Sequence, residues 1–209
     1  INIYEKGHYK SPEINVWGIS DKNLFLEANE VIKKETKPFI AIIQTAHNHR
    51  PFMIPPGETE FICQKADPDT LYKYGFESQA EYEAFCYTDF CFKKFMEAAQ
   101  QQSYFNNTIF VFIGDHGVEG EAGAMYPEAW TSKRLNDEHV PLLYYAPSLL
   151  QPETHHFTVS QVDLLPTLAG MLDQSYVNTG IGRDVLKQKD FFHSAFIIHH
   201  DEANVGMVT

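Results

Sequence analysis

Asp115 and His116 are neighbours in the stretch "TIFVFIGDHGVEGEAG", residues 108–123, and a glycine stands on either side of the pair. Side chains that are adjacent in a strand point to opposite faces, so a neighbouring pair can meet at one ion only where the strand becomes a loop. The flanking glycines allow the backbone angles that such a turn needs. A carboxylate oxygen beside an imidazole nitrogen suits Zn²⁺, Mn²⁺ or a similar cation. The pattern predicts a metal-binding pair, and its alternative is a turn-forming Asp beside a surface His.

A second group of polar residues, "TAHNHRPF", follows another apolar run at residues 38–45. His47 and His49 are two positions apart, so they share a face if the strand continues; otherwise one is a plain loop histidine. An imidazole at this place can donate to an anionic oxygen or protonate a leaving group. His139, just ahead of "VPLLYYAP", is a third candidate. Its alternative is a capping or surface histidine.

The elements around these residues alternate between helix and strand. Helices are predicted where apolar residues recur at helical spacing, with Ser20 and Asp163 as N-caps, over residues 20–35, 79–102 and 160–172. Strands are predicted where apolar residues run almost without interruption, over residues 38–45, 109–113, 140–147 and 191–200. Such strands, covered on both faces, indicate an α/β fold with a mostly parallel sheet between helices. Ligands bind beyond the carboxyl ends of strands in these sheets, where both polar groups fall.

The composition excludes several classes of protein. The 209 residues are 44% hydrophobic and 21% charged, which is typical of a globular chain, and carry a net charge of −12. No basic run exceeds a pair, which argues against nucleic-acid binding through a basic patch. No apolar run approaches the roughly 20 residues of a membrane span. Cys63, Cys86 and Cys91 lack zinc-finger spacing, and three thiols are favoured over one disulfide that involves Cys63.

Five segments, in their order along the chain, resemble the sulfatase-type branch of the alkaline phosphatase superfamily. They are "PFIAIIQTAHNHRPF", "NNTIFVFIGDHG", "HVPLLYYAP", "QVDLLPTLAGML" and "GIGRDVL". The resemblance is strongest to lipoteichoic acid synthase-like phosphoglycerol transferases and to phosphoethanolamine transferases, and it extends from about residue 20 to about residue 190. It implies an α/β/α sandwich.

The resemblance also implies roles for individual residues. Asp115 and His116 match the pair that binds one divalent metal ion, which is Mn, Zn, Mg or Ca. His49 matches a histidine that contacts the transferred phospho group, so it is both a catalytic and a substrate-binding candidate. His139 falls on a position that is histidine in some relatives only, and it stays a catalytic candidate. His47 has no histidine counterpart in the most similar relatives.

The function implied is transfer or hydrolysis of phosphate esters on envelope lipid head groups or glycans. It proceeds through a covalent intermediate on a hydroxyl nucleophile upstream of this chain. A divalent cation would offset the repulsion between an anionic ester and a chain of charge −12. The alternatives are a sulfatase that hydrolyses sulfate esters and a binding domain with a degenerate site.

The same resemblance implies a place in the cell and an extent for the domain. It implies the periplasmic or extracellular face of the cell envelope, with membrane association only through segments absent from this chain. We expect residues 1–209 to be the C-terminal portion of a single sulfatase-like catalytic domain, incomplete at both ends and inactive alone.

Overall fold

The structure is a computed structural model, and it describes the chain except for residues 118, 188–192 and 200–203. The chain forms two compact units, Ile1–Gln151 and Pro152–Thr209. All the candidate site residues belong to the first unit. We describe each unit by itself.

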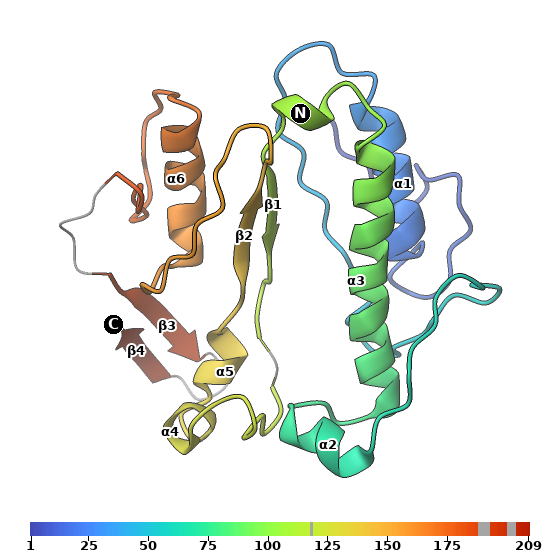
Figure 1. Cartoon of the computed structure of the whole chain (residues 1–209), viewed down its shortest axis with the longest axis vertical. Coiled ribbons are helices and arrows are strands. Elements are labelled where there is room, and N and C mark those ends of the chain that lie inside the picture. Colours follow the sequence, from blue (N-terminus) through green and yellow to red (C-terminus); the bar gives the residue numbers. More distant parts are fainter. Residues whose placement is uncertain (118, 188–192, 200–203) are drawn as a thin grey trace. The chain divides into compact units, whose positions relative to one another are not determined.

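Two long helices, α1 (Asp21–Ile32) and α3 (Gln79–Ala99), pack along each other in the first unit (Figure 1). Ser20 caps α1 by accepting the backbone N–H of Asn23 at 3.2 Å, as the sequence predicted. Ser78 caps α3 in the same way. Both helices end three residues earlier than predicted. Their facing sides build a largely aromatic core, whose buried members are Phe25, Tyr87, Cys91, Phe95, Ala99, Phe105 and Phe110.

Two short strands, β1 (Phe110–Ile113) and β2 (Leu142–Tyr145), cover this core. They pair in the antiparallel sense, with Phe110 opposite Tyr145. Residues 114–141 connect them through a loop and two short helices, so no long crossover helix returns the chain in a parallel direction. The helices and strands agree with the predicted α/β class. The predicted mostly parallel sheet is not what the described strands form.

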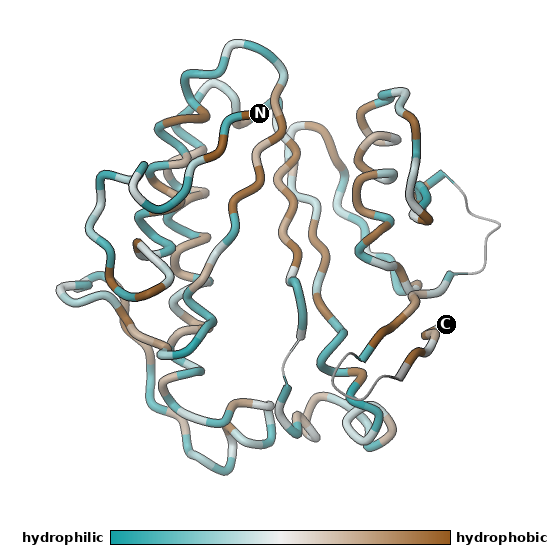
Figure 2. The backbone as a smooth tube through the Cα atoms, turned by 180° about the vertical axis from the view of Figure 1, so that it is seen from behind, coloured by the Kyte–Doolittle hydropathy of each residue, from teal (hydrophilic) through white to brown (hydrophobic). Residues whose placement is uncertain are grey.

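The apolar segment 38–45 is extended but has no paired neighbour among the strands in the described residues. Its hydrophobic character is visible beside that of β1 and β2 (Figure 2). Ile43 packs against the core cluster, whereas Ile40 and Ile42 are 82% and 90% exposed. The strand predicted here is therefore an extended chain whose backbone groups form no ladder.

Shorter elements lie in the connections of the first unit. Residues 51–69 were predicted to be a loop, but a helix begins at Pro68, the first helical residue, and Asp67 is its N-cap. The short elements are α2 (Pro68–Lys73), the 3-10 helix η1 (Phe105–Asn107), α4 (Glu128–Thr131) and α5 (Leu135–Glu138).

Cys63, Cys86 and Cys91 are free thiols, as the sequence analysis favoured. Burial, and a hydrogen bond that the Cys63 thiol makes to Cys86, raise the pKa of Cys63 to about 11.

The second unit contains a helix and an antiparallel pair of strands. The elements are the 3-10 helix η2 (Gln161–Asp163), α6 (Leu164–Met171), β3 (Ala195–His199) and β4 (Asn204–Val208). Residues 191–192 and 200 of the strand predicted at 191–200 lie outside the described residues. Asp163 stands at the N-cap position of α6, as predicted, although its carboxylate bonds outside α6: it accepts the N–H of Ser160, in a capping box at the start of η2, and that of Arg183, both at 2.9 Å. Within the described ranges, no helix is long and apolar enough to cross a bilayer.

Candidate functional site

The loop after β1 presents both predicted metal ligands to solvent. Asp115 and His116 are exposed, and Oδ1 of Asp115 accepts the backbone N–H of His116 at 3.0 Å. Nδ1 of His116 lies 2.9 Å from the carbonyl oxygen of Gly117. A carbonyl oxygen can only accept, so the proton of the neutral ring is on Nδ1 and the lone pair is on Nε2. That is the tautomer in which Nε2 can bind a metal.

Gly117 fixes this arrangement through a close backbone approach. Its N–H donates to the carbonyl oxygen of Asp137 at 2.6 Å. A Cβ atom at Gly117 would lie 2.7 Å from the carbonyl oxygen of His139, and still closer to that of Asn136. Only glycine fits here, because the atoms that a Cβ would meet belong to the backbone and not to the end of a flexible side chain. The loop after β1 that carries Asp115, His116 and Gly117, called the Asp-His-Gly loop below, therefore lies directly against residues 136–139.

Residues 134–139, which lie against Gly117, are stabilised by polar contacts of their own. Arg134 has a left-handed backbone with φ of 52°, and its Nε pairs with Oδ2 of Asp137 at 2.7 Å. The buried Asn136 side chain donates to the carbonyl oxygen of Gly120 at 3.0 Å. The Asp-His-Gly loop is thus tied to this segment on both sides of residue 118. Sequence reasoning missed Asn136, which no local motif marks.

His139 is brought close to the Asp-His-Gly loop through its backbone, while its ring lies among aromatic side chains. The Tyr126 hydroxyl lies 3.0 Å from Nδ1 of His139. The rings of Tyr126 and Trp130 stack on each other, and the His139 ring meets both edge-on at 5.7 Å and 5.2 Å. The imidazole is exposed. The backbone of His139, a catalytic candidate, is therefore adjacent to the loop that carries Asp115 and His116, and its ring is oriented by Tyr126 and Trp130.

His47 and His49 do not share a face. The chain turns after the extended segment, with the His49 N–H donating to the carbonyl oxygen of Ala46 at 3.2 Å. His47 is buried and packs at 4.6 Å on the Tyr87 ring, whereas His49 is exposed. Nδ1 of His47 lies 3.7 Å from the Asp21 carboxylate. Of the two histidines, His49 is the one whose side chain is open to solvent.

The His49 ring stacks on the indole of Trp17, with the ring centroids 4.4 Å apart and the planes inclined by 22°. The indole N–H of Trp17 donates to the carbonyl oxygen of Arg50 at 2.9 Å. A stacked imidazole is held by its face, so its two nitrogens, on the ring edge, can still be used. Sequence reasoning missed Trp17, because nothing in the sequence around it indicates that it contacts His49.

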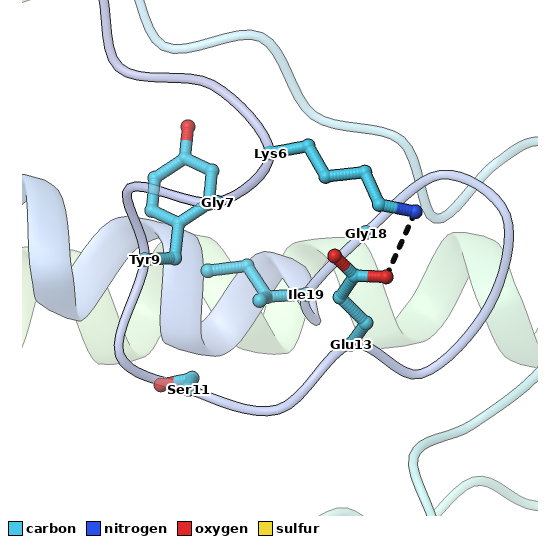
Figure 3. Close-up of a pocket in the computed structure, with 7 residues that line it drawn as sticks. All are labelled: Lys6, Gly7, Tyr9, Ser11, Glu13, Gly18 and Ile19. Atoms are coloured by element: carbon cyan, nitrogen blue, oxygen red, sulfur yellow. Dashed lines mark ion pairs between the residues drawn. The ribbon is translucent and has the colours of Figure 1, made fainter.

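Among the described residues, no group of three or more His, Cys, Asp or Glu side chains is arranged to hold a metal ion. The candidate metal site here is the Asp115–His116 pair, whose donors fit a divalent cation in type and tautomer. A small hollow of about 60 Å³ lies elsewhere, under the N-terminal loop, and contains none of the candidate residues (Figure 3).

The comparisons with known proteins now bear on this site. The Sulfatase family profile matches residues 2–174, which is most of the chain. The chain is a member of the sulfatase family. The matched range includes every candidate residue of this sulfatase-family chain.

Similar proteins refine that placement. The chain is 27% identical over 165 residues to the lipoteichoic acid synthase-like protein YvgJ of Bacillus subtilis, a match that covers 75% of this chain and 26% of that protein. A solved structure from Vibrio parahaemolyticus, of a protein in the alkaline phosphatase superfamily, is 25% identical with a TM-score of 0.74. It covers 98% of this chain and 46% of the solved one. The predicted sulfatase-type branch, close to lipoteichoic acid synthase-like proteins, is confirmed.

A second solved structure agrees in fold. The lipoteichoic acid synthase LtaP of Listeria monocytogenes matches with a TM-score of 0.66 and 18% identity, over 86% of this chain and 45% of that one. This sulfatase-family chain spans about a quarter of the length of the curated relatives that it matches. The comparisons thus establish the family and an α/β fold of the alkaline phosphatase type.

Proposed function

We propose that this sulfatase-family protein is a metal-dependent enzyme that transfers or hydrolyses phosphate esters of envelope lipid head groups or glycans. The single observation that carries the proposal is the Asp115–His116 pair, exposed at the end of β1. Nδ1 of its imidazole lies 2.9 Å from the carbonyl oxygen of Gly117, an acceptor that favours the proton on Nδ1 and leaves the lone pair of Nε2 for a metal. The relatives named lipoteichoic acid synthases favour phosphate as the ester.

In this proposal Asp115 and His116 hold one divalent cation, which is Mn, Zn, Mg or Ca. The bound cation would stabilise negative charge that builds up on the transferred group. The carbonyl oxygen of Gly117 favours a proton on Nδ1 of His116 because it can accept a hydrogen bond from it, so that Nε2 stays available. A catalytic site usually takes three protein ligands or more, so further ligands would join this pair.

The two remaining histidines have separate tasks in the proposal. His49 binds the anionic oxygens of the substrate through a ring nitrogen and can hold or donate a proton there. His139 stands beside the Asp-His-Gly loop and contributes a second imidazole, oriented by Tyr126 and Trp130. The step itself uses a hydroxyl nucleophile from another part of the protein and passes through a covalent intermediate.

Sulfate esters are the second candidate substrate, because the family profile that matches is that of the sulfatases. The net charge of −12 would repel either ester, so charge does not separate the two. Parallel assays with a generic phosphodiester and a generic aryl sulfate would separate them. Turnover of the sulfate ester alone would favour the second candidate.

The proposal extends to fold and location. An α/β/α sandwich is supported by the solved alkaline phosphatase superfamily structure, which covers nearly the whole chain. A place at the outer face of the cell envelope is supported by the lipoteichoic acid synthases among the relatives. Membrane attachment would come through segments other than the helices described here.

The test of this proposal is Asp115→Asn in the protein at its natural length. The substitution keeps the side-chain shape and removes the charge that holds a cation, so bound metal and turnover should fall together, each about 10- to 100-fold. Asp69→Asn, at an exposed carboxylate in α2, is the matched control and should leave both unchanged. Wild-type metal stoichiometry in Asp115→Asn would contradict the proposal.

A further inference from the structure

The loop that carries His49 is contacted by side chains from elsewhere in the first unit. Residues 46–50 follow the extended segment and belong to no helix or strand. A loop of this kind normally moves freely, which costs entropy each time its side chains must be ordered around a substrate. Several contacts hold this one from outside, among them an ion pair of Arg50 with Glu77 at 2.6 Å, and three others are the ones that bear on the position of His49.

The first contact is a buried carboxylate. Asp21, 1% exposed at the start of α1, accepts the backbone N–H of Ala46 at 3.0 Å and that of His47 at 3.2 Å. Both bonds are charge-assisted and shielded from water, which makes them strong for their type. They fix the direction in which the chain leaves the extended segment.

The second contact comes from α3. The Thr88 hydroxyl lies 3.2 Å from Oδ1 of Asn48 and also donates toward the carbonyl oxygen of Ala84. Thr88 is buried on the inner side of α3. This contact ties the middle of the loop to a rigid helix.

The third contact is Trp17, which touches the reactive side chain itself. Its indole stacks on the His49 ring, and its N–H donates to the carbonyl oxygen of Arg50. One side chain thus holds both the imidazole and the backbone that follows it. The indole fixes the orientation of the ring plane, which the two other contacts do not touch.

Trp17 can serve as a support because the loop that carries it is fastened in turn. The backbone N–H groups of Lys10 and Ser11 donate to the Glu27 carboxylate on α1 at 2.8–3.2 Å. Lys6 and Glu13 close the loop with an ion pair at 2.8 Å, drawn in Figure 3. The N-terminal loop is therefore held against the same helix that provides Asp21.

We infer that Trp17 is a positioning residue for His49: it holds the imidazole in the plane from which a ring nitrogen meets the anionic ester. The inference rests on the proposed role of His49. Trp17 itself touches no reacting atom. A displacement of about 1 Å in such a group can cost on the order of 100-fold in rate.

The experiment is nuclear magnetic resonance of isotope-labelled histidine in the protein at its natural length, with His49→Gln to identify the His49 signal. The indole ring current should shift the His49 ring protons upfield. Trp17→Ala should abolish that shift, and Trp17→Phe, which keeps an aromatic face, should keep part of it. Tyr4→Ala removes another exposed aromatic of the same loop and should leave the signal unchanged. A His49 signal indifferent to Trp17→Ala would overturn the inference.

Turnover completes the test and separates this inference from the proposed function. Trp17→Ala should lower kcat on the order of 100-fold with a smaller change in KM, and Trp17→Phe should restore much of it. Wild-type kcat in Trp17→Ala, alongside a large loss in His49→Ala, would overturn positioning by Trp17. Wild-type kcat in His49→Ala would instead overturn the proposed role of His49, and with it the positioning role that rests on it. The magnetic resonance result would still decide whether the stack exists.

Discussion

The two loops that carry the candidate chemistry are held in place by different means. The His49 loop is fastened by side chains that come from other elements, namely Trp17, Asp21 and Thr88. The Asp-His-Gly loop is fastened mainly by close backbone approaches at Gly117 and Gly120, with one side-chain hydrogen bond from Asn136 to the carbonyl oxygen of Gly120. One loop can lose an anchor and keep the others, whereas the other has no room to adapt.

This difference has a consequence for mutation. Side-chain anchors contribute separately, so removing one should lower activity or stability by degrees. A glycine pressed against a carbonyl oxygen leaves no such gradation, because an added Cβ must displace the backbone. We therefore expect stability and turnover to fall together at Gly117, and separate losses of different size when single anchors of the His49 loop are removed.

Gly117→Ala should have the largest effect. The new Cβ would meet the carbonyl oxygens of Asn136 and His139, so the loop or residues 136–139 must move. We expect a loss of about 1–3 kcal/mol in the free energy of unfolding and turnover at least about 100-fold lower. Thermal unfolding measures the first effect, and a turnover assay measures the second.

Gly123→Ala is the matched control for that change. It lies in the same connection between β1 and β2, and an added Cβ would meet nothing within 4 Å. Its unfolding free energy should stay within about 0.5 kcal/mol of the wild type. Equal behaviour of the two variants would mean that the backbone approach at Gly117 does not hold the loop.

His49→Ala should come second. Removing an imidazole that works on the substrate should lower turnover about 100-fold or more, while bound metal stays at its wild-type level. His156→Ala, at another exposed histidine, should change neither quantity. Loss of metal in His49→Ala, as in Asp115→Asn, would make His49 a ligand and remove the contrast between the two loops.

Asp21→Asn should have an intermediate effect. The amide keeps one acceptor oxygen but presents an N–H₂ group where the carboxylate accepted two backbone N–H bonds. We expect a loss of about 1–3 kcal/mol in unfolding free energy and a partial loss of turnover. Thr88→Val, which removes a single neutral hydroxyl, is the comparison and should cost about 1 kcal/mol. Inactivity of Asp21→Asn at full stability would show that this anchor is not graded.

The contrast between the loops also separates what the sequence could reveal from what it could not. Asp115, His116 and their glycines are adjacent in the chain, so the pattern alone indicated their chemistry. Trp17 and Asp21 act on residues about 25 to 33 positions away, and no local spacing marks such contacts. The long helices α1 and α3 were predicted to within a few residues because their caps and apolar spacing are local, whereas the short helices α2, α4 and α5 were predicted as loop.

Strand pairing was the part of the fold that the sequence could not determine. A continuous apolar run indicates a buried strand but does not say which strand lies beside it, or in which direction. The segments at β1 and β2 were found, and their antiparallel pairing was not. For the same reason the segment 38–45, apolar throughout, was predicted as a strand although it has no paired neighbour among the described strands.

Tyr126→Phe should have the smallest effect on turnover. It tests whether His139 is held by its backbone, like the Asp-His-Gly loop, or by a side chain, like His49. The change removes the hydroxyl 3.0 Å from Nδ1 of His139 but keeps the ring that meets the imidazole edge-on. An exposed neutral hydrogen bond contributes about 0.5–1.5 kcal/mol or less, so turnover should stay near the wild type. Trp130→Ala removes the other aromatic neighbour and should disturb His139 more, because the stacked pair is lost. If Tyr126→Phe instead lost as much turnover as His139→Ala, the hydroxyl would itself take part in orienting or protonating the imidazole. His139 would then depend on a side-chain anchor, as His49 does, although its backbone lies against Gly117.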